Sequence, residues 1–234
     1  MHRREFHFAT AGAFASLLLV VPRQAEALNL ASLSNAEASQ GLKGALEAGA
    51  IAAVSLLGKQ DGFLGNPQVR IGLPGSLNDA AKFMRMLGQG KRVDTLITSM
   101  NRAAEAAVPM ARDMLVGAVK TITVTDARNI LAGGDTSVTD FFATRTRTPL
   151  QLKFLPVVTQ VVKGSSLTAQ YNELAGKAAG MGLVRKEDAT VQSYVTARAL
   201  DGLYLMIGEE EKKIRSNPLA ADSAVVRKVF GALK

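Results

Sequence analysis

Apolar residues recur every three or four positions along most of the chain, a spacing typical of helices that pack on a core. The first such stretch follows Ser34, and the spacing from Ser34 to Glu37 matches a capping box, a pair of side chains that begins a helix. Its apolar positions are Leu42, Leu46, Ala50, Ala53, Val54 and Leu57. Gly58 follows, and glycine commonly ends a helix. The pattern therefore predicts a helix that ends near residue 57.

Residues 58–75, GKQDGFLGNPQVRIGLPG, interrupt this periodicity with glycines and prolines and predict one long irregular loop. Such a loop is uncommon in a compact helical domain unless it covers something. Phe63, Asn66 and Arg70 are candidate binding residues in a lid or rim. The alternative is that the loop plugs one end of the helix bundle with Phe63 and Ile71.

Helical spacing resumes at Ser76, and the apolar face of this segment extends to Leu87. Pro109 is expected to end or kink the following helix, because proline lacks an N–H and clashes with the preceding turn. Shorter helices are predicted from Thr125 to the Gly133-Gly134 pair and over residues 136–146. Later helices are expected to begin at Pro149, at Ser165 or Ser166 and near Val191, and the last to carry Val225, Val226, Val229, Phe230 and Leu233. Inward positions after Pro149 are expected at Leu152, Leu155 and Val158 or Val161.

No segment shows alternating apolar and polar residues over several strands in series. The sequence therefore predicts an all-α fold, a single compact domain of roughly eight to ten helices with the long irregular loop at 58–75.

The stretch NILAGGDTSVTDFF, residues 129–142, has the composition of a junction between two helices. Gly133 or Gly134 can close the first helix in the left-handed conformation, and Asp135 can cap the next by accepting its free N–H groups. Asp140 would then lie inside the new helix. The alternative is an anion or substrate site at the helix start, formed with the hydroxyls of Thr136 and Ser137.

Two further clusters combine charged and polar residues. Asn101, Arg102 and Glu105 lie within little more than one helical turn, which is typical of a buried polar cluster that ties elements together.

The segment GEEEKKIR pairs Glu209 with Lys213 and Glu211 with Arg215 at a spacing of four, which predicts a solvated, salt-bridged face. Glu210 lies outside these pairs, near the apolar stripe of the same helix. A carboxylate-dependent hydrolase or lyase that uses Glu210 with Asp135 or Asp140, assisted by Mg²⁺ or Ca²⁺, is the enzymatic alternative.

The composition narrows the possible chemistry. The chain has no cysteine and no tryptophan, and both histidines, His2 and His7, lie near the N-terminus. Thiol nucleophiles, histidine-based triads and the usual zinc or copper sites are therefore not expected in the mature chain. Only an oxygen-ligated Mg²⁺ or Ca²⁺ would fit, and the sequence itself predicts neither a metal site nor a cofactor. P-loop, G-x-S-x-G and G-x-G-x-x-G motifs are also absent.

The N-terminus has the features of a cleavable export signal. A basic opening, MHRREF, precedes an apolar run from Ala9 to Val21, and Ala25-Glu26-Ala27 fits a cleavage site. The Arg3-Arg4 pair is similar to a twin-arginine signal, and the alternative is an ordinary Sec signal that happens to hold two arginines. Residues 1–27 are therefore expected to be removed, with a periplasmic mature chain that starts near Leu28, is not a lipoprotein and has no transmembrane helix.

The chain carries a net charge of +8, with 28 basic and 20 acidic residues. Cleavage after Ala27 would leave 25 basic and 18 acidic residues, a net charge of +7. No basic run interleaved with aromatic residues is present, so nucleic acid is not expected as a partner. For an exported protein, an anionic or amphipathic ligand or an envelope protein is the expected partner, although the charge can also serve solubility alone.

Four stretches together resemble a known family: SNAEASQGLKGALEAGAIAAVSLLGKQDGFLGNPQVRIGLP, SMNRAAEAAVP, NILAGGDTSVTDFF and ALDGLYLMIGEEEKKIRSNP. Their order and spacing are similar to those of a bacterial exported-protein family catalogued as domain-of-unknown-function family 4197. The resemblance implies an all-helical exported domain and no particular activity. Many members look like exported or lipid-anchored envelope proteins, but this chain lacks the cysteine that a lipid anchor needs. The sequence thus favours a non-enzymatic binding or envelope-associated protein.

Overall fold

The computed structural model describes residues 33–163, 166–182, 185 and 188–233. Over these residues the chain forms nine α-helices and no strand, which confirms the predicted all-α fold and the expected number of helices. The expected export signal and Ser165 lie outside the described residues. The α-helices are α1 (Asn35–Leu57), α2 (Gly75–Met86), α3 (Gly90–Ala107), α4 (Ala111–Lys120), α5 (Val124–Leu131), α6 (Ser137–Val162), α7 (Ser166–Gly180), α8 (Val191–Ser216) and α9 (Ala224–Gly231). Two short 3-10 helices are η2 (Val108–Met110) and η4 (Pro218–Ala220).

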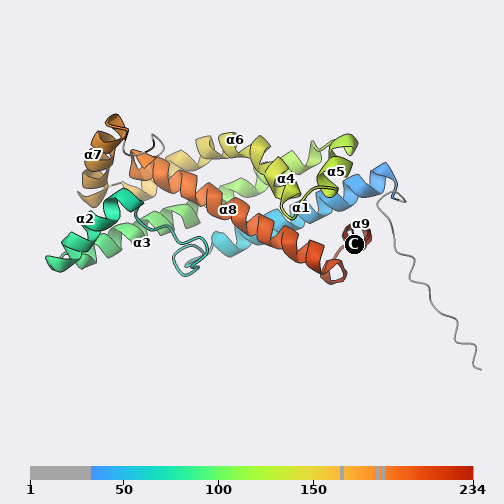
Figure 1. Cartoon of the computed structure of the whole chain (residues 1–234), viewed down its shortest axis with the longest axis horizontal. Coiled ribbons are helices and arrows are strands. Elements are labelled where there is room, and N and C mark those ends of the chain that lie inside the picture. Colours follow the sequence, from blue (N-terminus) through green and yellow to red (C-terminus); the bar gives the residue numbers. More distant parts are fainter. Residues whose placement is uncertain (1–32, 164–165, 183–184, 186–187, 234) are drawn as a thin grey trace, which may run out of the picture.

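The helices form an elongated bundle around α8 (Figure 1). Helix α8 runs along the long axis and contacts α1, α3 and α6, while α1 also packs on α4, α5 and α9. Helices α2 and α7 lie at one end of the bundle, and α5 and α9 lie towards the other (Figure 1). Helix α8 therefore packs against much of the core, and grooves can form between α8 and its neighbours.

The predicted start of α1 is confirmed. The Glu37 N–H donates to the Ser34 hydroxyl oxygen at 3.2 Å, and the Ser34 N–H donates to the Glu37 carboxylate at 3.0 Å, so a complete capping box is present. The same carboxylate binds Lys228 of α9. This ion pair and the hydrogen bonds to Ser34 lower the pKa of Glu37 to about 2.

Helix α6 differs from the prediction, because it passes through Pro149 instead of beginning there. Its buried side follows a strict spacing of four residues, through Phe142, Thr146, Leu150, Phe154, Val158 and Val162. This continuous stripe packs along α8 and α3, so burial holds the helix together where proline removes a hydrogen bond. Both prolines, Pro149 and Pro156, are on the exposed side. The expected inward positions Leu152 and Leu155 were wrong, since these side chains are 72% and 38% exposed, and of the two valines it is Val158 that is buried.

Three smaller boundaries also differ or are refined. The short helix α5 begins at Val124, after Thr123, which forms a capping box with Asp126, so its start is one residue earlier than expected. Pro109 does end α3, because the chain continues there as η2. Leu87, expected on the inward face of the helix after the loop, is 60% exposed.

Among the described residues, no helix combines the length and apolarity needed to cross a bilayer.

The Glu37 contact gives a prediction about pH. The lowered pKa of Glu37 means that its contribution to stability is complete above its ordinary value of 4.5 and is lost as the pH falls towards about 2. Glu37→Gln keeps an acceptor for the Ser34 N–H and removes the ion pair with Lys228. We expect urea unfolding to show a lower midpoint for Glu37→Gln than for wild type at pH 6, and the gap to narrow steadily from pH 4.5 to pH 3. A gap that stays constant over this range would show that the carboxylate charge does not stabilise the fold.

Candidate functional site

The long loop is held against α3 by a buried carboxylate. Glu105 is 5% exposed, and its Oε1 accepts the N–H groups of Phe63 and Leu64 at 3.0 and 3.1 Å. Arg102 donates to the other oxygen of Glu105 at 2.6 Å and also to Asp61 at 2.8 Å. Glu105 therefore supplies the loop with a hydrogen-bond acceptor that the loop backbone does not provide. Arg102 balances the negative charge of Glu105.

Asn101 fixes the far end of the same loop. This fully buried amide accepts the Ile71 N–H and donates to the Ile71 carbonyl, both at 2.8 Å, as a neighbouring strand would. It also donates to the Ile97 carbonyl within α3. The predicted cluster of Asn101, Arg102 and Glu105 is thus a set of anchors for the loop.

The loop fills space in the core with its apolar side chains. Phe63 is fully buried, and Val69 and Ile71 are buried with it. Gly202 of α8 makes room for these side chains, since a Cβ there would lie 2.8 Å from Phe63 and 3.2 Å from Val69. Of the two predicted roles for the loop, its apolar side chains therefore form a plug.

The outer side of the loop borders a small cleft. Asn66 accepts the Gln68 N–H at 3.1 Å and shapes the turn. Arg70 is exposed and lines a cleft of about 190 Å³ together with Tyr194, Arg198 and Asp201 of α8. The two candidates therefore differ: Asn66 organises the backbone, and Arg70 faces a hollow on the surface.

A second buried carboxylate, Glu211 of α8, caps the start of α6. It is 6% exposed and accepts the Val138 N–H at 3.2 Å and the Thr139 N–H and hydroxyl at 2.9 and 2.7 Å. Arg215 donates to it at 3.0 Å and also to the Ser137 hydroxyl at 3.0 Å. The pair of Glu211 and Arg215 was predicted on a solvated face, and that prediction was wrong because the face packs on the start of α6.

Residues 129–142 join two helices, as predicted, but the predicted capping residues do not cap them. Asp135 is exposed and does not cap α6: Thr136 occupies the N-cap position and makes no capping bond with its side chain. Glu211 supplies that acceptor from another helix. Neither glycine is left-handed, since among the described glycines positive φ occurs at Gly88 and Gly182. Gly133 instead allows the chain to pass close to Ser137, because a Cβ at position 133 would lie 2.5 Å from the Ser137 side chain.

Thr136 and Asp140 lie on a cleft between α6 and α8. Their side chains are joined by a hydrogen bond of 3.0 Å, and the cleft has a volume of about 290 Å³. Arg147, Asp201, Tyr204, Glu209 and Lys212 also line it. Its charges are largely paired: Arg147 binds Asp201 at 2.7 Å and Lys212 binds Glu209 at 2.9 Å. The bond to Glu209 raises the pKa of Lys212, and burial raises the pKa of Tyr204.

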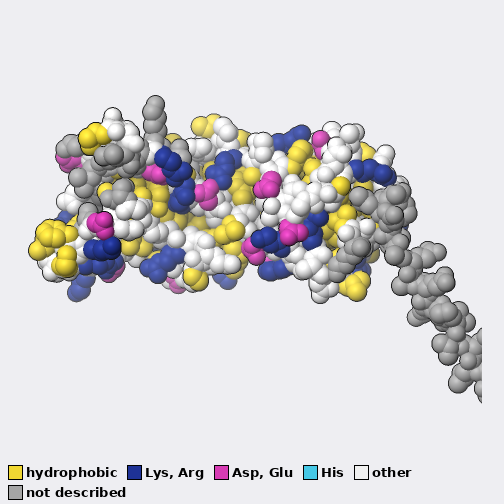
Figure 2. Space-filling model, viewed as in Figure 1, with side chains coloured by type: hydrophobic (Ala, Val, Ile, Leu, Met, Phe, Trp, Pro, Cys, Tyr) yellow, Lys and Arg dark blue, Asp and Glu magenta, His cyan; other side chains and the backbone are white. Residues whose placement is uncertain are grey.

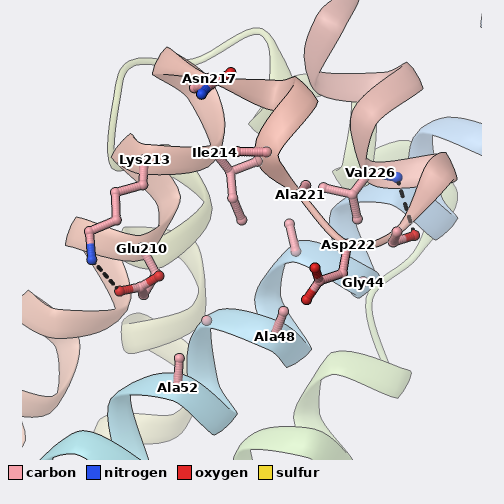
Figure 3. Close-up of a pocket in the computed structure, with 14 residues that line it drawn as sticks. Gly44, Ala48, Ala52, Glu210, Lys213, Ile214, Asn217, Ala221, Asp222 and Val226 are labelled. Carbon is pink, nitrogen blue, oxygen red and sulfur yellow. Dashed lines mark hydrogen bonds and ion pairs between the residues drawn. The ribbon is translucent and has the colours of Figure 1, made fainter.

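A groove lies on the other side of α8, between α1, α8 and α9 (Figure 3). It has a volume of about 420 Å³, within the range of ligand-binding pockets. Its α1 side consists of small residues spaced four apart, Gly44, Ala48 and Ala52, and of Ala45 and Gly49. Ile214, Ala220, Ala221 and Val226 complete its apolar surface. Val226 of α9 already lies close to Gly44, so an apolar chain can approach α1 at Ala48 and Ala52, which are exposed.

Carboxylates stand at both sides of this groove. In Figure 3 the Asp222 carboxylate points towards Ala48, and no ion pair joins Asp222 to another described residue. Glu210 stands at the opposite side and binds Lys213 at 2.6 Å. The three ionic groups in the groove thus give a net charge of −1 in a chain whose net charge is +8.

The structure distributes the predicted site residues over separate places. Glu210 lines the groove beside α1, whereas Asp140 lines the cleft between α6 and α8, so the two carboxylates do not share a hollow. Asp135 is near Lys212 at the edge of that cleft and adds to the rise of the pKa of Lys212. Over the part of the chain that is described, no group of three or more His, Cys, Asp or Glu side chains could hold a metal ion.

Apart from Glu210, the residues that line the groove between α1, α8 and α9 were not predicted from the sequence. Its small residues were available as a signal, since Gly44, Ala48 and Ala52 recur at a spacing of four on the first helix. Asp222 gave no signal, because its position depends on how η4 and α9 turn back onto α1.

Fold and site together define an all-helical domain with grooves along both sides of one central helix. A family model described as "Protein of unknown function (DUF4197)" matches residues 32–231. The chain therefore belongs to the DUF4197 family, as its motifs indicated. Searches of curated proteins and of solved structures gave no match.

The Glu211 cluster gives a prediction about stability. Glu211→Ala leaves the N–H groups of Val138 and Thr139 without an acceptor and removes the carboxylate that pairs with the half-buried Arg215. We expect the free energy of unfolding to fall by about 3 to 5 kcal/mol. The control is Glu209→Ala on the same helix, whose partly exposed pair with Lys212 should contribute no more than about 1 kcal/mol. Chemical denaturation of both variants tests this, and equal losses would show that Glu211 does not cap α6.

Proposed function

We propose that the protein is a non-enzymatic envelope protein that binds an amphipathic, cationic helical segment of a partner protein in the groove between α1, α8 and α9. The groove itself carries the proposal: its apolar floor is made of small residues, and a carboxylate stands at either side. The partner would pack apolar side chains on α1 and place a lysine or arginine near Asp222.

The size and spacing of the groove fit a short stretch of helix. Gly44 and Ala52 lie eight positions apart on α1, which corresponds to about 12 Å or two helical turns, and Ala48 lies midway between them. Small residues at this spacing let two helix backbones approach closely, and ridges of a partner helix can then enter the groove. Asp222 supplies a charge that selects a cationic segment over an acidic one.

A site-specific crosslinking experiment tests the proposal. A photoreactive phenylalanine derivative at Ala52, on the exposed part of the groove, is activated in envelope extract, and the crosslinked peptide is identified by mass spectrometry. We expect a protein adduct whose peptide carries basic residues beside apolar residues at helical spacing. Ala48→Trp fills the groove, and Asp222→Lys repels the basic residues, so each should lower the yield of the adduct roughly tenfold.

The matched control places the same photoreactive residue at Ala106, an exposed alanine of α3 that does not line this groove. It should not give the same adduct. An adduct that forms equally from position 106, or that survives both Ala48→Trp and Asp222→Lys, would rule out the groove as the binding site.

The proposed location is the periplasm, reached through the expected twin-arginine signal at Arg3-Arg4. The basic opening, the apolar run and the small residues before Leu28 support it. Replacing both arginines with lysine should leave precursor in the cytoplasm, whereas wild type should yield a mature chain that starts near Leu28. Fractionation followed by N-terminal sequencing measures both. Unchanged export of the double variant would contradict the twin-arginine route.

A further inference from the structure

The end of the molecule formed by α2 and α3 carries exposed apolar side chains. Phe83, Met86 and Leu87 are 57%, 77% and 60% exposed and occupy the last turn of α2 and the residue after it. Their spacing of three and four residues places them on one side of the helix. Figure 2 shows hydrophobic side chains at this extreme end of the molecule, where Figure 1 places α2. We call Phe83, Met86 and Leu87 the apolar tip.

Cations surround the apolar tip. Between residues 79 and 94 the chain carries four basic and two acidic side chains, a net charge of +2. Asp79 binds Lys82, and Asp94 binds Arg85 across the two helices. Lys91 and Arg92 add two further positive charges beside the tip, and Arg92 also donates a hydrogen bond to the Gln89 side chain at 3.0 Å.

The positions of Lys91 and Arg92 are unfavourable for the helix that carries them. Both are exposed in the first turn of α3, which holds no acidic residue. The start of a helix has a positive partial charge, so cations there lower helix stability and anions raise it. The two cations therefore lower the stability of the start of α3 and add positive charge beside the apolar tip.

We infer that the apolar tip inserts into the surface of a lipid bilayer that contains anionic lipids, with Lys91 and Arg92 against the headgroups. The arrangement follows the layers of such a surface, because apolar side chains enter the acyl boundary while cations remain at the level of the phosphates. Gly88, at φ +78°, turns the chain between the two helices and keeps the tip and the cations together. This site lies apart from the groove beside α9.

The absence of tryptophan from the chain permits a direct test. Phe83→Trp introduces a single tryptophan at the tip, and Leu152→Trp introduces one at a side chain of α6 that is 72% exposed. Vesicles of phosphatidylcholine with phosphatidylglycerol should shift the emission of Trp at position 83 to the blue, and brominated lipids should quench it. Vesicles of phosphatidylcholine alone should do neither, and position 152 should not respond to either kind.

Three variants separate the contributions to binding measured by vesicle sedimentation. Met86→Ser with Leu87→Ser should weaken binding about tenfold, as expected for loss of apolar burial. Lys91→Glu with Arg92→Glu should weaken it at least as much, and anionic residues at these two positions suit the start of α3. Ala48→Trp, which fills the proposed partner groove, should bind vesicles like wild type.

Several results would overturn the inference. Unshifted emission at position 83 with anionic vesicles would exclude insertion. Equal shifts at positions 83 and 152 would mean general adsorption of a basic surface. A blue shift that appears without vesicles and grows with protein concentration would show that a second copy of the chain covers the tip.

Discussion

The fold depends on two buried glutamates that bind backbone N–H groups of other segments. Glu105 on α3 and Glu211 on α8 each accept the N–H groups of two consecutive residues, and each is balanced by an arginine of its own helix. The first holds the loop, and the second caps α6. Buried charges are costly unless paired and hydrogen-bonded, so each site favours one arrangement of its segments over looser ones.

Both glutamates position a segment beside α8: Glu211 lies on α8 itself, and Glu105 holds the loop that packs on α8. This explains where the hollows lie. Glu211 fixes the start of α6 along one side of α8, and Gly202 lets the loop plug pack on the same helix. Three helices, α1, α3 and α6, then cover most of α8. The cleft beside α6, the small cleft beside the loop and the groove beside α9 all lie along α8, so these hollows follow from the way the polar anchors position their neighbours.

The sequence was sufficient for what depends on local pattern. Helical spacing gave the all-α fold, and the capping box gave the start of α1, because both rest on residues a few positions apart. It failed where distant packing decides: the buried stripe of α6 overrides Pro149, and Glu211 replaces Asp135 as the cap of α6 although the two are far apart in the chain. Asp222 was missed for the same reason, because its place in the groove depends on packing between distant segments. The cluster of Asn101, Arg102 and Glu105 was predicted because its members are close in sequence.

The distribution of charge is informative beyond its net value. The groove beside α9 is net negative, whereas the tip of α2 and α3 has excess positive charge, and Figure 1 places α9 and α2 towards opposite ends of the long axis. If the tip contacts a bilayer, the groove therefore faces away from it and stays open to a partner. Because the anionic surface and the cationic segment carry opposite charge, neither ligand would compete for the site of the other. The two proposed sites are thus compatible in a single protein that links a membrane surface to a second protein.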